Sequence, residues 1–216
     1  MRTIKALACA TAVVAGVATS MAQSNVYSLN VVGYYNVPCP ADQLVFIANQ
    51  LNTTNNTIAS LIPNPPPGSQ LYKFASGNWS SYTFDDLDLV WYPNGSATLN
   101  MGEAAMFKAA AATTLTFVGE VTQGALSNPL VMGEQLFARS SMVPQAGLVT
   151  TDLKYPAEGG DQAYKYTGGN WSSYTFDDLD LVWYPTEPNL GVGEGAMFKK
   201  AASSTITTWS RNFTVH

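Results

Sequence analysis

The feature that most constrains the fold is an internal repeat. Seventeen residues, Gly77–Pro93, recur without one change as Gly169–Pro185, at an offset of 92 positions. The match continues on both sides of this block, for example where Gly102–Lys108 resembles Gly193–Lys199 after a one-residue deletion. Self-similarity at a fixed period indicates one structural unit used twice, so we expect two homologous repeats of about 90 residues.

The repeat is not uniformly preserved. Of the 36 residues in 41–76, only seven are identical in 133–168, whereas the next 17 residues are all identical. A uniform old duplication does not leave this contrast. Either recent recombination copied the block, or both repeats need the same surface there.

Short alternating runs between turn signals indicate β-strands. In Trp79–Asp85, Tyr82 and Phe84 share one face and Trp79 lies on the other. Ser76-Gly77-Asn78 is typical of a hairpin turn, as is its counterpart at 167–170. Further strands are expected at 44–47, 71–74 and 114–121, and one in which Leu87, Leu89 and Trp91 share a face.

One short helix is expected in this β pattern. Thr57 is suited to cap a helical turn over 58–62, and Pro63 to stop it. Glu103–Ala112 is rich in Ala, but its counterpart contains Gly195, so both are interpreted as strands. The sequence therefore predicts an all-β protein of two tandem sandwich- or barrel-like repeats, with at most one short helix in each.

The N-terminal residues have the three-part organisation of a secretory signal peptide. Arg2 and Lys5 precede an apolar run over 6–18, and Ser20-Met21-Ala22 offers a cleavage site before Gln23. We expect cleavage after Ala22 and a secreted protein. We expect each repeat to open with a Val-Gly strand. The predicted organisation is therefore a signal peptide at 1–22 and repeats at 23–115 and 116–216.

The charge balance limits the partners. Without Arg2 and Lys5, eight basic residues face 15 acidic ones, so the net charge falls from −5 to −7. An acidic chain with no basic cluster disfavours nucleic acid and anionic membranes as partners. No second apolar stretch is long enough to span a bilayer. Charged residues are only 12% of the chain, which is common in extracellular β proteins.

Several motifs together resemble a known group of proteins. Val26–Tyr34 follows the signal peptide directly and leads to Leu44–Asn52, then Tyr-Lys-Phe, Trp-Tyr-Pro and Gly-Glu-Ala motifs. This succession resembles exported β-repeat proteins of unknown function from planctomycete- and verrucomicrobial-type bacteria, over most of the mature chain. The resemblance implies an all-β fold and export, and it implies no activity and no site residues.

Catalytic signatures are missing from the sequence. The single histidine, His216, is the last residue, so a Ser/His or Cys/His pair would depend on the chain terminus. One histidine and one thiol of the mature chain cannot complete a zinc site. A hydrolase that uses paired carboxylates stays formally possible. We expect a protein that is not an enzyme and needs no cofactor, with calcium as the one possible exception.

Clustered acidic residues are the reason for considering calcium. Carboxylate oxygens suit Ca²⁺, and extracellular calcium sites are often weak and borne on the surface. The Asp-Asp-Leu-Asp run lacks the glycine and the late Glu of an EF-hand loop, and a turn in which Asp bonds its own backbone explains it equally. The candidate ligands are Asp85, Asp86 and Asp88, with Asp177, Asp178 and Asp180 in the second copy.

Aromatic residues form the second candidate site. Exposed Trp and Tyr beside polar groups suit sugar rings, whereas buried ones would fill the core or the seam between the repeats. The candidates are Trp79, Tyr82 and Trp91, with Trp171, Tyr174 and Trp183 in the second copy.

The third possibility is assembly with other chains. A strand-like N-terminus at Asn25–Tyr35 could add to the sheet of another subunit or pair within its own repeat. Cys39 could form an intermolecular disulfide or stay free and buried, and its flanking prolines favour exposure. The sequence favours a secreted or cell-surface structural or interaction protein that binds itself or other surface proteins. The alternative is an extracellular carbohydrate-binding module, with or without calcium.

Overall fold

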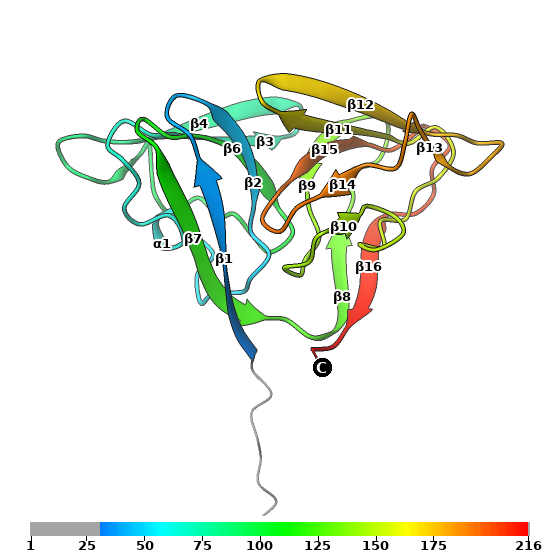
Figure 1. Cartoon of the computed structure of the whole chain (residues 1–216), viewed down its shortest axis with the longest axis horizontal. Helices are drawn as coiled ribbons and strands as arrows, with labels where there is room; N and C mark the ends of the chain where they lie inside the picture. Colours follow the sequence, from blue (N-terminus) through cyan, green and yellow to red (C-terminus); the bar gives the residue numbers. More distant parts are fainter. Residues whose placement is uncertain (1–30, 216) are drawn as a thin grey trace, which may run out of the picture.

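The computed structural model describes residues 31–215, which fold into two similar all-β halves (Figure 1). The predicted all-β class and the internal duplication are therefore confirmed. The first half contains β1 (Val31–Cys39), β2 (Leu44–Ala48), α1 (Ile58–Leu61), β3 (Gln70–Ala75), β4 (Asn78–Phe84), β5 (Trp91–Tyr92), β6 (Ala104–Lys108) and β7 (Thr113–Val121). The second contains β8 (Gly124–Pro129), β9 (Leu136–Arg139), β10 (Gly147–Leu148), β11 (Gln162–Thr167), β12 (Asn170–Phe176), β13 (Trp183–Tyr184), β14 (Asn189–Leu190), β15 (Ala196–Lys199) and β16 (Thr208–Phe213).

Each half combines a two-stranded ribbon with a five-stranded sheet. The first has the ribbon β1-β7 and the sheet β2-β6-β3-β4-β5, and all its pairs within these are antiparallel. The second repeats this with the ribbon β8-β16 and the sheet β9-β15-β11-β12-β13, and adds the short pair β10-β14. Among the described residues, no helix is long and apolar enough to cross a bilayer.

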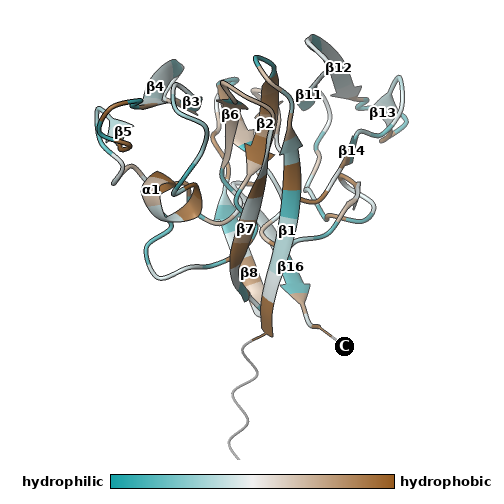
Figure 2. Cartoon of the chain, turned by 60° about the vertical axis from the view of Figure 1, so that its left-hand side comes forward, coloured by the Kyte–Doolittle hydropathy of each residue, from teal (hydrophilic) through white to brown (hydrophobic). Residues whose placement is uncertain are grey.

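The ribbons correct the expected boundary between the repeats. Position 115, the expected end of the first repeat, lies inside β7, and β7 pairs with β1 over its whole length, from Val31 opposite Val121 to Cys39 opposite Thr113. The two Val-Gly strands, expected to open separate repeats, are thus partners in one ribbon. The second half opens with β8 instead. The strands β8 and β16 lie at the end of the molecule away from the hairpins β3-β4 and β11-β12, and β1 and β7 run along the molecule toward that end (Figures 1 and 2).

Local chemistry explains several elements that the sequence predicts. Thr57 caps α1, with its Oγ1 accepting from the N–H of Ser60 at 3.2 Å, while the Ser60 hydroxyl accepts from the N–H of Thr57 at 3.1 Å. The hairpin turn between β3 and β4 places Ser76 and Gly77 at φ of 50° and 79°, the positive values that a two-residue turn of this kind requires. The predicted cap, helix and hairpin are therefore confirmed.

The strand expected through Leu87, Leu89 and Trp91 is wrong. Residues 86–90 form bends instead, Leu89 has a φ of 54°, and its side chain and that of Leu87 are exposed. Asp85 closes this turn because its Oδ1 accepts from the N–H of Leu87 at 2.8 Å and of Asp88 at 2.9 Å. The apolar alternation in the sequence therefore belongs to a turn with apolar side chains in solvent.

Each sheet packs one face on its own core and the other on the seam between the halves. The first core includes Leu71, Phe84, Trp91, Phe107 and Phe117. The second includes Phe137, Tyr155, Phe176, Phe198 and Trp209. The seam itself is filled by a separate cluster: Phe46, Ala48, Ala104, Met106, Ala138 and Met197.

The repeated Gly-Glu motif joins the halves through the main chain. The N–H of Ala48 donates to the carbonyl of Gly193 at 2.8 Å, and the N–H of Ser140 donates to that of Gly102 at 3.0 Å. Gln50, fully buried, adds a side-chain bridge: its Oε1 accepts from the N–H of Gly193 at 2.8 Å, and its Nε2 donates to Ser140 Oγ at 3.1 Å. The halves are therefore locked together by pseudo-symmetric hydrogen bonds.

Candidate functional site: an aromatic groove between the halves

Trp79 and Trp171 occupy the same position in β4 and β12, and both are exposed at the seam. Trp79 stands opposite Phe74 across its hairpin, with ring centroids 5.0 Å apart, and Trp171 stands opposite Tyr166 at 5.1 Å. The two indoles keep 44% and 48% of their surface exposed. The two identical blocks, Gly77–Pro93 and Gly169–Pro185, thus place one tryptophan each at the junction of the halves.

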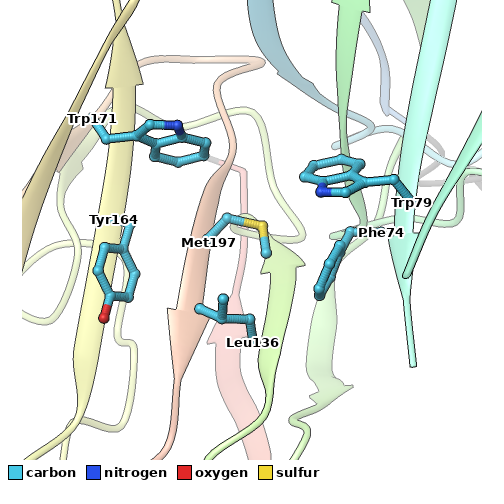
Figure 3. A pocket seen from close by; sticks show the side chains of 6 residues that line it. All are labelled: Phe74, Trp79, Leu136, Tyr164, Trp171 and Met197. Carbon is cyan, nitrogen blue, oxygen red and sulfur yellow. The ribbon is translucent and has the colours of Figure 1, made fainter. Parts of the chain in front are cut away.

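The two tryptophans line one cavity of about 200 Å³. In Figure 3 the indoles lie on opposite sides of the space, with Met197 between them. Phe74 lies below Trp79, and Tyr164 lies below Trp171. The full lining is Phe74, Trp79, Leu136, Tyr164, Trp171 and Met197.

The halves differ in one side chain that faces the seam. Phe46 of β2 corresponds to Ala138 of β9, since Phe46 pairs with Met106 and Ala138 with the equivalent Met197. The Phe46 ring crosses the seam to meet Trp171 edge-on, with centroids 6.1 Å apart. Ala138 has no ring to do the same toward Trp79.

A more polar cavity of about 240 Å³ adjoins the aromatic one, since Phe74 and Leu136 line both. It adds Lys73, Glu103 and Arg139, among other residues. Glu103 Oε2 accepts from Lys73 Nζ at 3.2 Å and from the N–H of Asn100 at 2.9 Å. Desolvation lowers the pKa of Arg139, although Glu103 opposes this. The groove therefore combines an aromatic slot with hydrogen-bonding groups at one side.

The other predicted aromatic residues do not join this groove. Trp91 and Trp183 are buried in the two cores, where the indole N–H donates to the Ile62 carbonyl and to Thr150 Oγ1 respectively, each at 2.9 Å. Tyr82 and Tyr174 are half-buried against the same cores. Only Trp79 and Trp171 of the six candidates come together.

The predicted calcium ligands lie in the turns after β4 and β12. Asp177 repeats the arrangement of Asp85, with its Oδ1 accepting from two N–H groups at 2.8 Å, and these bonds lower the pKa of both carboxyls. Asp88 Oδ2 accepts from Tyr92 at 2.9 Å, as Asp180 Oδ2 does from Tyr184. Asp86 and Asp178 are exposed. Over residues 31–215, no three Asp, Glu, His or Cys residues gather in a group that could hold a metal ion.

Two further candidates concern assembly. Cys39 is free and only 1% exposed, so the exposure inferred from its flanking prolines is wrong and an intermolecular disulfide has no accessible thiol. The N-terminal strand pairs with β7 of its own half from Val31 onward, while positions 25–30 and the predicted signal peptide lie outside the described residues.

Sequence reasoning missed four residues of the groove: Phe74, Leu136, Tyr164 and Met197. Their strands were predicted or lie in the matched segments of the repeat, and Phe74 faces Trp79 by simple hairpin register. That register could have added Phe74 to the site. Leu136 and Met197 carry no such signal, because they reach Trp79 only through the packing of one half on the other.

No protein-family model, curated protein or solved structure matches the chain.

Proposed function

We propose that this chain is an exported binding module, without catalytic activity, that holds a sugar ring in the groove between its halves. The observation that carries the proposal is that Trp79 and Trp171 share one cavity while almost half of each indole is exposed. Large aromatic rings gathered in a concave exposed site are typical of a surface that a ligand covers.

The chemistry of the groove favours a sugar over a wholly apolar ligand. The C–H faces of a sugar ring pack against aromatic faces, and its hydroxyls need hydrogen-bond partners at the edge. The aromatic cavity offers the first, and the adjoining cavity offers Lys73, Glu103 and Gln135 for the second. A wholly apolar ligand would contact only the aromatic part of the groove.

The lining supports binding rather than hydrolysis. Glycoside hydrolysis generally needs two carboxyl groups on either side of the bond. Among residues 31–215, no carboxylate lines the aromatic cavity, and Glu103 is the single one lining its polar neighbour. Tyr164 carries the one hydroxyl of the aromatic cavity, and it donates to Gln162 Oε1 at 2.7 Å. The proposal that the protein is exported rests on the signal-peptide pattern of residues 1–22.

The test is a glycan array probed with the wild-type chain and with Trp79→Ala plus Trp171→Ala. We expect the double variant to lose at least about tenfold in affinity for each bound glycan, because stacking on each ring contributes on the order of 1 kcal/mol. Ala138→Phe is expected to weaken binding as well, because its ring would approach Trp79 as the equivalent Phe46 ring approaches Trp171.

The matched control is Tyr92→Ala plus Tyr184→Ala. These tyrosines are as exposed as the two tryptophans, at 47% and 49%, and they occur in the same repeated block, but they do not line the groove. Circular dichroism verifies that each variant is folded. Unchanged glycan binding by the folded tryptophan variant, or no binding by the wild-type chain, would contradict the proposal.

A further inference from the structure

A cluster of ionisable side chains is buried in the second half, away from the groove. Asp161 precedes β11 and Lys200 follows β15, and Gln162 pairs with Lys199 in the ladder between these strands. Asp161 and Lys200 therefore stand opposite each other at its end. Both side chains are 0% exposed, and Lys200 Nζ lies 2.5 Å from Asp161 Oδ2.

The surroundings exclude water from this pair. The ring of Tyr155, itself 1% exposed, has its centroid 5.6 Å from Lys200 Nζ. The carbonyl of Pro156 accepts from Nζ at 3.0 Å. Two charges in such a site lose their hydration, so transfer of a proton from Nζ to Oδ2 removes both charges at once. The product is a neutral amine in contact with a neutral carboxyl group.

The two oxygens of Asp161 have different partners. Oδ1 accepts from the N–H of Ala201 at 2.9 Å and from the hydroxyl of Ser204 at 2.6 Å. Two donors at this distance would stabilise the negative charge that forms on Oδ1 when a nucleophile adds to Cγ. Oδ2, which faces Lys200, accepts from the N–H of Glu158 at 2.9 Å.

Glu158 supplies a carboxylate beside the amine. Its Oε2 lies 3.0 Å from Lys200 Nζ, and it accepts from the N–H of Ile206 at 2.9 Å and of Thr205 at 3.0 Å. Desolvation raises the pKa of Glu158, but the hydrogen bonds from Ile206, Thr205 and Lys200 outweigh it and lower the pKa to about 2. The group is therefore ionised and placed to accept a proton from Nζ.

We propose that Lys200 and Asp161 condense into an amide between Nζ and Cγ, which covalently joins the residue before β11 to the residue after β15. One Nζ proton passes to Oδ2, and the neutral Nζ adds to Cγ while Oδ1 takes the negative charge. Glu158 then accepts a second Nζ proton and delivers it to the Oδ2 hydroxyl, which leaves as water. One C–N bond forms and one C–O bond breaks, so no oxidant, reductant or cofactor is required.

The first half shows that the fold does not need ions at this place. Its residues at the positions of Asp161 and Lys200 are Ser69 and Ala109, at the same end of the β3-β6 ladder. Glu158 and Tyr155 correspond to prolines, so all four members of the cluster differ together. Ser69 Oγ accepts from the N–H of Ala110, the counterpart of Ala201, at 3.1 Å.

The test is mass spectrometry of a protease digest of the folded wild-type chain. We expect a branched species that joins the peptide of Asp161 to the peptide of Lys200, lighter than their sum by one water molecule, with fragments that place the bond at these two residues. Recovery of both peptides separately and unmodified would overturn the proposal. So would a water loss that maps to any other residue.

Variants provide the controls. Asp161→Ser plus Lys200→Ala installs the residues of the first half, and we expect a folded chain with the unmodified mass. Glu158→Gln keeps the shape of the side chain but cannot accept the proton, so we expect the condensation to slow at least about 100-fold, the lower end of the range for loss of a general base. Condensation of Glu158→Gln at the wild-type rate would overturn the role of Glu158.

Discussion

Cys39 ends β1 between two prolines, and its thiol is buried rather than presented to a partner chain. Flanking prolines describe only the local backbone, which is extended. Whether an extended residue is exposed depends on what covers it, and here β7 and the core of the first half do so. Burial at the residue scale was therefore not readable from neighbouring residues in the sequence.

The thiol of Cys39 is expected to resist modification in the native chain. Desolvation raises the pKa of Cys39 from 9.0 to about 11, which lowers the thiolate fraction at neutral pH roughly 100-fold, and burial blocks the reagent besides. In a Cys9→Ser background, where Cys39 is the single thiol, a disulfide reagent should react slowly with native protein and stoichiometrically in denaturant. Rapid native labelling, or a covalent dimer on a non-reducing gel, would count against this.

At the scale of elements, the sequence predicts well wherever local chemistry decides. The Thr57 cap, the hairpin at Ser76-Gly77 and the strands around it follow from side chains within a few residues of each other. The turn at 86–90 was misread because Leu87 and Leu89 alternate as in a strand, whereas Asp85 binds the backbone of the turn. The hydrogen bonds that Asp85 accepts, rather than the alternation of apolar residues, therefore determine the structure of this segment.

Removing the cap of α1 tests how much this local chemistry contributes. Thr57→Ala should lower the free energy of unfolding by about 1 kcal/mol, because the N–H of Ser60 loses its side-chain acceptor. Urea unfolding measures the change. Thr54→Ala, an exposed threonine three residues earlier, is the matched control and should change stability little. Equal effects of the two substitutions would show that the cap contributes nothing specific.

For the whole molecule, the duplication was visible in the sequence but the groove was not. Repetition shows that Trp79 and Trp171 are equivalent, and it does not show which faces of the two sheets meet. The groove depends on that meeting. The packing of the seam also reveals that Ala138 stands where the other half has Phe46, whose ring reaches Trp171.

Close packing at the seam makes a small substitution costly. A Cβ on Gly195 would lie 2.3 Å from the Cβ of Ala104 and 2.9 Å from Cδ1 of Phe46. Gly195→Ala should therefore lower the free energy of unfolding by about 1–3 kcal/mol, measured by urea unfolding, as overpacked cores typically do.

Gly191→Ala is the control for that substitution. Its nearest neighbour beyond the adjacent residues would be Glu194 Oε2 at 3.4 Å, an ordinary contact. If Gly191→Ala and Gly195→Ala were equally destabilising, general backbone effects rather than seam packing would explain the loss.

The difference between Phe46 and Ala138 also bears on stoichiometry. Two identical tryptophan-bearing blocks would suggest two equal sites per chain, as a symmetric dimer of single repeats would offer. Because the Phe46 ring contacts Trp171 whereas Ala138 has no ring to contact Trp79, the two tryptophan walls of the aromatic cavity differ. A ligand there would bind once per chain and in one orientation. A single side chain that differs between the two copies therefore makes the two sides of the site distinguishable.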